Sequence, residues 1–142
     1  MISCMETVLV YNEFFIFLEE KHGTRAVEDY WRYVADTTFD EPRRIIKEEG
    51  LEGVYKYLNE TWKEEGDVFE ISRDERSVTV AVHDCSSVRK LHSTKHIKPY
   101  SDYCRHCLIM YQRLFGDLGY DFQVEILDPD RGACRMYITR RD

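Results

Sequence analysis

The sequence has 142 residues, which is enough for one domain with a hydrophobic core but too few for two domains of ordinary size. Hydrophobic residues make up 43% of it and the formal net charge is −7, which predicts a packed globular protein and argues against nucleic-acid binding. We expect a single domain over residues 1–142, with helices over about 5–63 and a sheet plus a Cys/His-rich helix over about 67–140.

The N-terminal segment predicts a cytoplasmic protein. It has neither a basic lead nor a small-residue cleavage site, so a signal peptide is not expected. The apolar run Phe14 to Leu18 is far shorter than the roughly 20 residues of a membrane span, which leaves a core helix or a face against a second subunit. In a reducing compartment the five cysteines are expected to be free thiols, metal ligands or redox groups.

Apolar residues at helical spacing fill the N-terminal part of the chain. They predict a helix over 5–21, a second one capped by Thr24, a third one that begins near Asp40, and a fourth over 51–63 that ends before Gly66. The predicted core stripe of the second helix contains Val27, Tyr30, Trp31 and Val34.

After Gly66 the spacing of apolar residues changes from helical to an alternation of apolar and polar residues. Alternation over 68–73 and 77–83 predicts one hairpin, and alternation over 120–127 and 133–140 predicts a second. Between them, 86–99 is expected as a short helix or loop, and 101–118 as an amphipathic helix that carries Cys104 and Cys107. The order predicts an α+β fold, in which the N-terminal helices and the Cys-bearing helix pack on a four-stranded antiparallel sheet.

The cysteine and histidine side chains are concentrated in this second part of the chain. Four of the five cysteines and four of the five histidines fall between His83 and Cys134. Thiolates and imidazoles hold zinc and similar metals, and Cys104 and Cys107 stand one helical turn apart on one face. The sequence therefore predicts a divalent metal, zinc or iron, held by Cys104 and Cys107 with further ligands from Cys85, Cys134, His83, His92 or His96. The alternative is that these thiols are small hydrophobic core residues.

Nucleophilic catalysis is a second possibility for the same cluster. A thiolate such as that of Cys107 could be activated by His83 or His106, although His106 lies off the apolar stripe and would by default be a surface residue. On the strand over 77–83, alternation places His83 opposite Val82, together with Cys85 if the strand extends that far. The candidate ligand-binding aromatics, which are also candidate core residues, are Tyr103, Tyr111 and Trp62, and the available acids are Glu70, Asp84 and Glu125.

The pattern from Val82 onwards resembles a known family. Its elements are His83-Asp84-Cys85, a polar crossover, Tyr103-Cys104-Arg105-His106-Cys107, Gly119-Tyr120 and Gly132-Ala133-Cys134-Arg135-Met136. Over about 60 residues this is similar to the L-2-amino-thiazoline-4-carboxylic acid hydrolase family and the related four-vinyl-reductase domains. The N-terminal helices match those of the family only in number and kind.

The resemblance implies both a fold and an activity. It implies an α+β domain shared with Golgi-transport tethering subunits and nitric-oxide-sensor haem domains, with a small-molecule pocket between helices and sheet. The hydrolase family opens a thiazoline ring at its C=N bond. The family cysteines carried over are Cys85, one of Cys104 or Cys107, and Cys134. Ser86 stands where the family often has proline and Met136 where an aromatic residue is common, so a different substrate pocket is expected.

These observations lead to one leading hypothesis and two alternatives. The leading hypothesis is a small-molecule-binding protein that hydrolyses a cyclic C–N bond at a Cys/His-lined, metal-containing pocket. The first alternative is a non-catalytic sensor or binding module for a hydrophobic ligand, similar to the four-vinyl-reductase domains. The second is a structural homodimer in which the first helix forms the interface.

Overall fold

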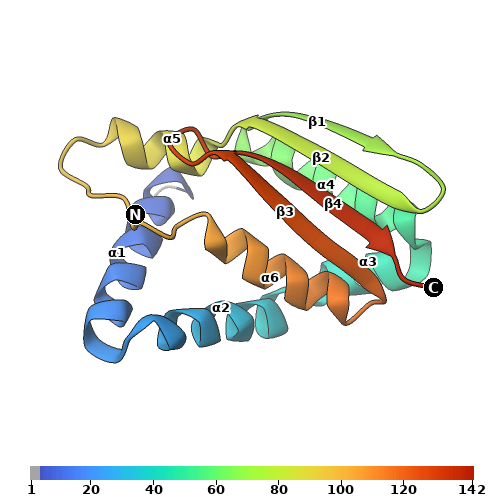
Figure 1. The fold of residues 1–142 in the computed structure, drawn as a ribbon, viewed down its shortest axis with the longest axis horizontal. Coiled ribbons are helices and arrows are strands. Elements are labelled where there is room, and N and C mark those ends of the chain that lie inside the picture. The colour runs from blue at the N-terminus through green and yellow to red at the C-terminus, as the bar shows by residue number, and fades with distance from the viewer. Residues whose placement is uncertain (1–3) are drawn as a thin grey trace.

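The fold consists of helices on one face of an antiparallel sheet (Figure 1). The computed structural model describes residues 4–142. The helices are α1 (Cys4–His22), α2 (Thr24–Thr38), α3 (Asp40–Glu49), α4 (Leu51–Glu65), α5 (Ser86–Ser93) and α6 (Arg105–Gly116). The strands are β1 (Val68–Arg73), β2 (Ser77–Asp84), β3 (Tyr120–Asp128) and β4 (Ala133–Arg140).

The four strands form one sheet in the order β1-β2-β4-β3, with every neighbouring pair antiparallel. The two hairpins therefore join through β2 and β4, where Val82 pairs with Cys134 and Val80 with Met136. Because successive side chains point to opposite faces of a strand, the buried residues of β2 and β4 share one face. These residues are Val78, Val80, Val82, Cys134, Met136 and Ile138.

Helices α4 and α6 cover that inner face and build the first hydrophobic core. Leu58 and Trp62 of α4 pack there with Phe115 of α6. The α4 stripe runs at helical spacing through Leu51, Val54, Leu58 and Trp62, as the sequence predicts. The helix ends at Gly66, whose left-handed conformation accommodates the chain reversal into β1.

A second core lies on the other side of α6. It brings together Val8 and Phe15 of α1, Trp31 of α2, Leu91 of α5 and Ile109 of α6. Figure 1 shows α6 running between α2 and the sheet, which explains how one helix serves two cores. Residues near the start of α6 therefore lie at the junction of the two cores.

The crossover between α5 and α6 is fastened to α1 by a buried amide. The Asn12 side chain is fully buried, its Nδ2 donates to the Lys98 carbonyl at 2.9 Å, and its Oδ1 accepts the Tyr100 backbone N–H at 2.7 Å. Buried polar groups are normally satisfied in this way. The amide thus holds the segment that leads into the Cys/His-rich part of the chain.

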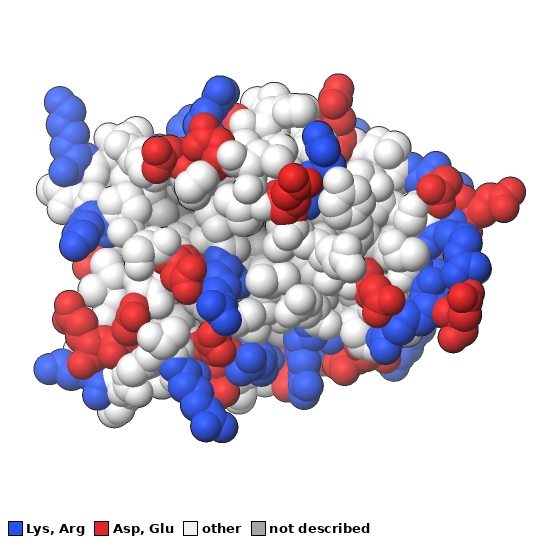
Figure 2. Space-filling view, viewed as in Figure 1, with Lys and Arg blue, Asp and Glu red and all other residues white. Residues whose placement is uncertain are grey.

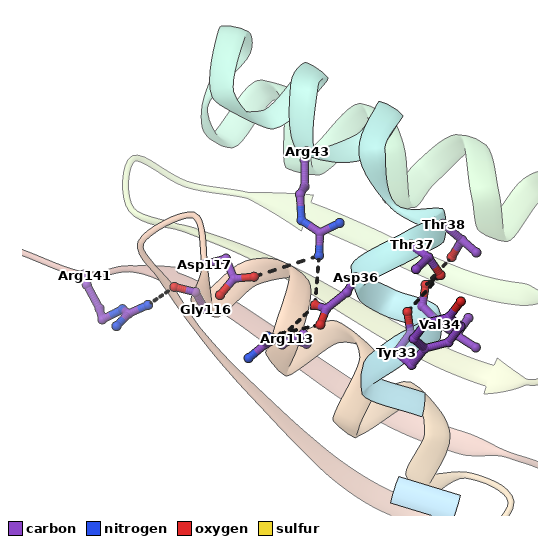
Figure 3. Close-up of polar contacts among 10 residues, drawn as sticks. All are labelled: Tyr33, Val34, Asp36, Thr37, Thr38, Arg43, Arg113, Gly116, Asp117 and Arg141. Carbon is purple, nitrogen blue, oxygen red and sulfur yellow. Dashed lines mark hydrogen bonds and ion pairs between the residues drawn. The ribbon is translucent and has the colours of Figure 1, made fainter. Parts of the chain in front are cut away.

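Charged residues tie the helices together at the surface. Figure 3 shows Asp36 of α2 between two arginines, with Arg113 of α6 at 2.7 Å and Arg43 of α3 at 3.8 Å, while Arg43 also reaches Asp117 at 3.9 Å. Figure 2 shows basic and acidic side chains interspersed around an uncharged centre on the face drawn. That face has no broad field of one sign of the kind that nucleic-acid binding uses.

The predicted α+β class and its four strands are confirmed, and the strand bounds agree to within one residue. Two local predictions are wrong, and the condition under which Cys85 would share a face with His83 is not met. The N-cap of α2 is Gly23 rather than Thr24, whose hydroxyl instead donates to Glu19. The helix expected over 101–118 begins only at Arg105 and ends at Gly116. Strand β2 stops at Asp84, so Cys85 turns into the core instead of sharing the face of His83.

The exposed side of α1 carries apolar residues. Val10, Phe14 and Phe17 are exposed there, with Phe17 exposed to 55%. This is the surface on which the predicted homodimer would depend, and the dimer stays a prediction. None of the helices within residues 4–142 has the length and apolar character to span a bilayer.

Candidate functional site

Four cysteines from three separate segments meet at the junction of the two cores. Cys85 follows β2, Cys104 precedes α6, Cys107 lies in its first turn, and Cys134 is on β4. All four are free thiols, and together they line a small space of about 30 Å³, here called the thiol pocket. The fold therefore brings together side chains that are up to 49 positions apart in the sequence (134 − 85).

A close approach of two turns builds one wall of the thiol pocket. The Cys85 backbone N–H donates to the Arg131 carbonyl at 2.9 Å, which seats the β3–β4 turn on the start of α5. Gly132 in that turn has φ +66°, and a Cβ added there would lie 2.4 Å from the Cys85 Cβ and 2.8 Å from the Val88 Cγ2. Only glycine fits both the backbone conformation and the space.

A larger space adjoins the thiol pocket and is here called the Cys107 cavity. Its volume is about 270 Å³, and it shares Cys85, Cys107 and His106 with the thiol pocket. Helices α1, α4 and α6 and the segment that leads into α5 enclose it. Its lining residues are Thr7, Val8, Tyr11, Thr61, Trp62, Glu65, Asp67, Cys85, Ser87, Tyr103, His106, Cys107 and Tyr111.

The imidazole of His106 is held in one orientation beside Cys107. His106 Nδ1 contacts the Tyr103 carbonyl, and its Nε2 lies 3.4 Å from the Cys107 Sγ. Because a carbonyl only accepts hydrogen bonds, Nδ1 carries the proton, which leaves the Nε2 lone pair facing the thiol. The Tyr103 ring packs edge-on against the imidazole at 4.7 Å between centroids and limits its rotation. This arrangement is a base next to a nucleophile, with a third group that orients the base.

Burial keeps this Cys–His pair uncharged. Burial, together with a smaller effect of the carboxylates of Asp67 and Glu65, raises the pKa of Cys107 to about 12. Burial also lowers the pKa of His106. Both shifts favour the neutral forms, so at neutral pH the pair is a thiol that donates to an imidazole rather than a thiolate–imidazolium pair.

Two carboxylates stand on the α4 side of the Cys107 cavity. Glu65 ends α4 and is exposed, while Asp67 follows it, is half-buried, and accepts the Ser86 backbone N–H at the start of α5. Burial raises the pKa of both carboxyls, and the charges of their acidic neighbours raise it further. A raised carboxyl pKa means that the charged form has too little compensation from cations or donors around it.

The comparisons with known proteins identify no family for this chain. No family model matches the sequence, and no curated protein matches it. A solved structure of a mutant Fe(II) unliganded H-NOX protein from K. algicida is similar at 13% identity with a TM-score of 0.37. The match covers 99% of this chain but only 64% of that one, so this chain spans about two thirds of the H-NOX chain. The resemblance to the thiazoline hydrolase and four-vinyl-reductase families stays a prediction.

The structure brings most of the predicted site residues together. Tyr103, Tyr111 and Trp62 all line the Cys107 cavity, and His106, expected at the surface, points into it beside Cys107. His106 is turned inward because the second core lies on its side of α6, where its ring packs against Phe15. Sequence periodicity places Trp31 on a core stripe of α2, but it does not show that this stripe packs on the His106 side of α6.

The structure does not bring His83 to the site. His83 lies on the exposed face of the sheet, with its Nε2 3.2 Å from a Glu70 carboxylate, whereas Cys134 on the neighbouring strand points to the inner face. Alternation along β2 therefore separates His83 from the thiols. Of the acids singled out from the sequence, Glu70 is bound to His83 and Asp84 to Arg89.

The acids that line the cavity, Glu65 and Asp67, were not anticipated from the sequence. They flank the Gly66 turn between α4 and β1, and no spacing rule links that turn to Cys107. The only sequence feature that relates to this contact is Ser86, next to Cys85 at the start of α5. A backbone N–H at the start of a helix attracts a carboxylate, here that of Asp67.

The predicted metal site does not have a suitable donor set. Within residues 4–142, no group of three or more His, Cys, Asp or Glu side chains is arranged to hold a metal ion. Cys104 and Cys107 were expected on one helix face, but Cys104 packs against the core between α1, α2 and α5, and Cys107 against the sheet core. Cys85 and Cys134 line the thiol pocket with them. Binding of zinc or iron stays a prediction.

Proposed function

We propose that this chain is a small-molecule-binding domain whose ligand site is the Cys107 cavity. The observation that carries this proposal is the cavity itself, about 270 Å³ in volume, at the junction of the two cores. Its size is near the lower end of ligand pockets, which measure roughly 300–1,000 Å³. Its apolar and aromatic walls with a few convergent polar groups are also typical of such pockets.

The ligand site can be tested by closing the cavity from α1. Val8 lines the Cys107 cavity and is 8% exposed, whereas Val10 lies on the same helix, is 52% exposed and is not part of the lining. Val8→Phe should fill the space, and Val10→Phe adds the same bulk outside it.

The readout is the pair of indole N–H resonances, because the protein has two tryptophans and only Trp62 lines this cavity. In a screen of small organic fragments, hits should shift the Trp62 resonance and leave that of Trp31 unchanged. These shifts should persist in Val10→Phe and disappear in Val8→Phe. Fragments that bind Val8→Phe as well as they bind the wild type would contradict the proposal.

Turnover at the same site is the second candidate function, and the contact between Cys107 and His106 favours it. In this mechanism His106 Nε2 takes the thiol proton while the sulfur adds to the carbon of a cyclic C=N bond, and the imidazole returns the proton to the ring nitrogen. Water, deprotonated by the same imidazole, then displaces Cys107, and the sulfur takes back that proton. The resulting ring carbinolamine forms a C=O bond as its C–N bond breaks, and the imidazole carries the hydroxyl proton to the leaving ring nitrogen, so the net reaction adds one water and opens the ring. The neutral resting pair means that attack and proton transfer occur together.

Catalysis can be tested with 2-amino-thiazoline-4-carboxylic acid, the substrate class that the sequence resemblance implies. The measurement is mass spectrometric detection of a product that has gained one water. Cys107→Ser should abolish formation of this product, whereas Cys104→Ser, which changes a thiol without an imidazole contact, should retain it. Equal turnover in both variants would remove Cys107 from the chemistry, and no turnover in the wild type would leave a binding module.

A further inference from the structure

The side chains around the Cys107 cavity carry an unbalanced negative charge. Glu65 and Asp67 line it, and among the described residues no Lys or Arg does so. His106 contributes no compensating charge because burial lowers its pKa. The charge of Arg89 acts on Asp67, but its guanidinium pairs with Asp84 at 3.1 Å. A bound anion would therefore meet two carboxylates and no cation.

The walls of the cavity are aromatic. Tyr11, Trp62, Tyr103 and Tyr111 contribute to the lining from three helices and the turn before α6. The faces of such rings carry partial negative charge and attract organic cations. Aromatic walls together with carboxylates are the chemical pattern that recognises ammonium groups.

A separate observation indicates a missing hydrogen-bond partner. Trp62 lines the cavity, is 6% exposed, and its buried indole N–H has no hydrogen-bond acceptor in the described chain. A buried donor without an acceptor destabilises the fold, because it has lost its hydrogen bonds to water. A ligand that carries an uncharged oxygen or nitrogen acceptor would supply that partner.

We propose that the Cys107 cavity binds an organic cation, namely an ammonium compound with a cyclic body and an uncharged hydrogen-bond acceptor. The carboxylates of Glu65 and Asp67 face its charge, the aromatic walls enclose its body, and the Trp62 indole donates to its acceptor. This inference rests on the proposed function, since it assigns a ligand class to the same cavity. It also disfavours substrates that carry a carboxylate, including thiazoline carboxylates.

Three probes of matched size and with a common ether acceptor test the charge preference. They are 2-phenoxyethylammonium, 2-phenoxyethanol and phenoxyacetate, each titrated into the full chain while the Trp62 indole resonance is followed. Two carboxylates a few ångströms from the ligand charge, with partial solvent screening, should favour the ammonium probe over the alcohol by about tenfold or more. Phenoxyacetate should bind most weakly.

Charge-neutralising variants identify the carboxylates that act. Glu65→Gln and Asp67→Asn should each weaken binding of the ammonium probe about three- to tenfold and leave 2-phenoxyethanol within about twofold. Glu60→Gln is the matched control, because Glu60 is on the same helix, is exposed and does not line the cavity. This control should bind all probes as the wild type does.

The possible outcomes separate the two proposals. If the alcohol or phenoxyacetate binds as tightly as the ammonium probe, the cation inference is overturned while the ligand site stands. If Glu60→Gln weakens binding as much as Glu65→Gln does, the recognition is long-range attraction by an acidic protein, and the cation site is likewise overturned. If no probe binds and the fragment screen also finds no ligand for the wild-type cavity, both proposals fail.

Discussion

Replacing Gly132 by alanine should strongly destabilise the protein, because this residue joins the final hairpin to the thiol pocket. At φ +66° an alanine would adopt a left-handed conformation that costs about 1–2 kcal/mol. Its Cβ would also lie 2.4 Å from the Cys85 Cβ, and relieving such an overlap by moving packed atoms costs about 1–3 kcal/mol. We therefore expect a loss of about 2–5 kcal/mol in the free energy of unfolding.

The assay is thermal unfolding followed by circular dichroism. For a chain of this length each kcal/mol shifts Tm by about 4 °C, so Gly132→Ala should lower Tm by about 8–20 °C. Gly116→Ala is the control, because Gly116 ends α6 without a positive φ and a Cβ there would meet nothing within 4 Å. Its Tm should stay the same or rise slightly, since alanine favours helix.

A second variant separates the two causes of the expected loss. In a Cys85→Gly background the overlap with the Cys85 Cβ is absent, while the approach to the Val88 Cγ2 at 2.8 Å remains. The additional cost of Gly132→Ala should therefore fall, but stay above the backbone part of about 1–2 kcal/mol. If Gly132→Ala unfolds within about 2 °C of the wild type, the hairpin does not dock on Cys85 as described, and the thiol pocket loses one wall.

Three further predictions concern the crossover, the cavity acids and the thiols. Asn12→Ala leaves the partly buried Lys98 carbonyl and the buried Tyr100 N–H without their partner, so urea unfolding should show a loss of about 2–4 kcal/mol, against less than about 0.5 kcal/mol for the half-buried control Asn59→Ala. Equal losses would contradict the role of the amide. The pKa of Asp67 is raised in the folded state, so protonated Asp67 favours folding and ionised Asp67 disfavours it as the pH rises through the folded pKa. Asp67→Asn should therefore raise Tm at pH 7, and this gain in Tm should shrink as the pH falls towards 4. A gain that is independent of pH would contradict this cause. In a Cys4→Ser variant the four remaining thiols have pKa values of about 11–12, so about 0.1% or less of each is thiolate at pH 8. They should therefore react with a disulfide reagent far more slowly in the folded protein than in urea. Elemental analysis of the same sample tests the zinc or iron prediction, which stoichiometric metal would support.

The sheet could be predicted from the sequence because the pattern that indicates a strand lies within a few consecutive residues. Val78, Val80 and Val82 alternate with polar residues, and the turn residues around Gly132 mark the reversal between β3 and β4. The α+β class and the position of the Cys-bearing helix follow from these local patterns. The start of α6 could not be predicted in this way. Residues 101–104 form turns, but they carry apolar side chains at helical spacing and so are predicted as part of the helix.

The site was only partly accessible to sequence reasoning, because its contacts are between segments far apart in the chain. The composition of the cluster singled out Cys107, and periodicity placed Tyr111 on the same helix face. Which imidazole meets the thiol depends on what packs around α6. Periodicity favours neither candidate, and only the second core, which includes α1 and α2, turns His106 inward and leaves His83 on the open face of the sheet.

The burial that brings the thiols together also determines what the site can do. Cys107 and His106 face an entering ligand as uncharged hydrogen-bonding groups, because desolvation raises one pKa and lowers the other. The charged groups of the same cavity are Glu65 and Asp67 on the α4 side. Recognition and chemistry are thus assigned to different parts of one cavity. Neutralising the carboxylates should change which ligands bind, whereas Cys107→Ser should change only whether a bound ligand reacts.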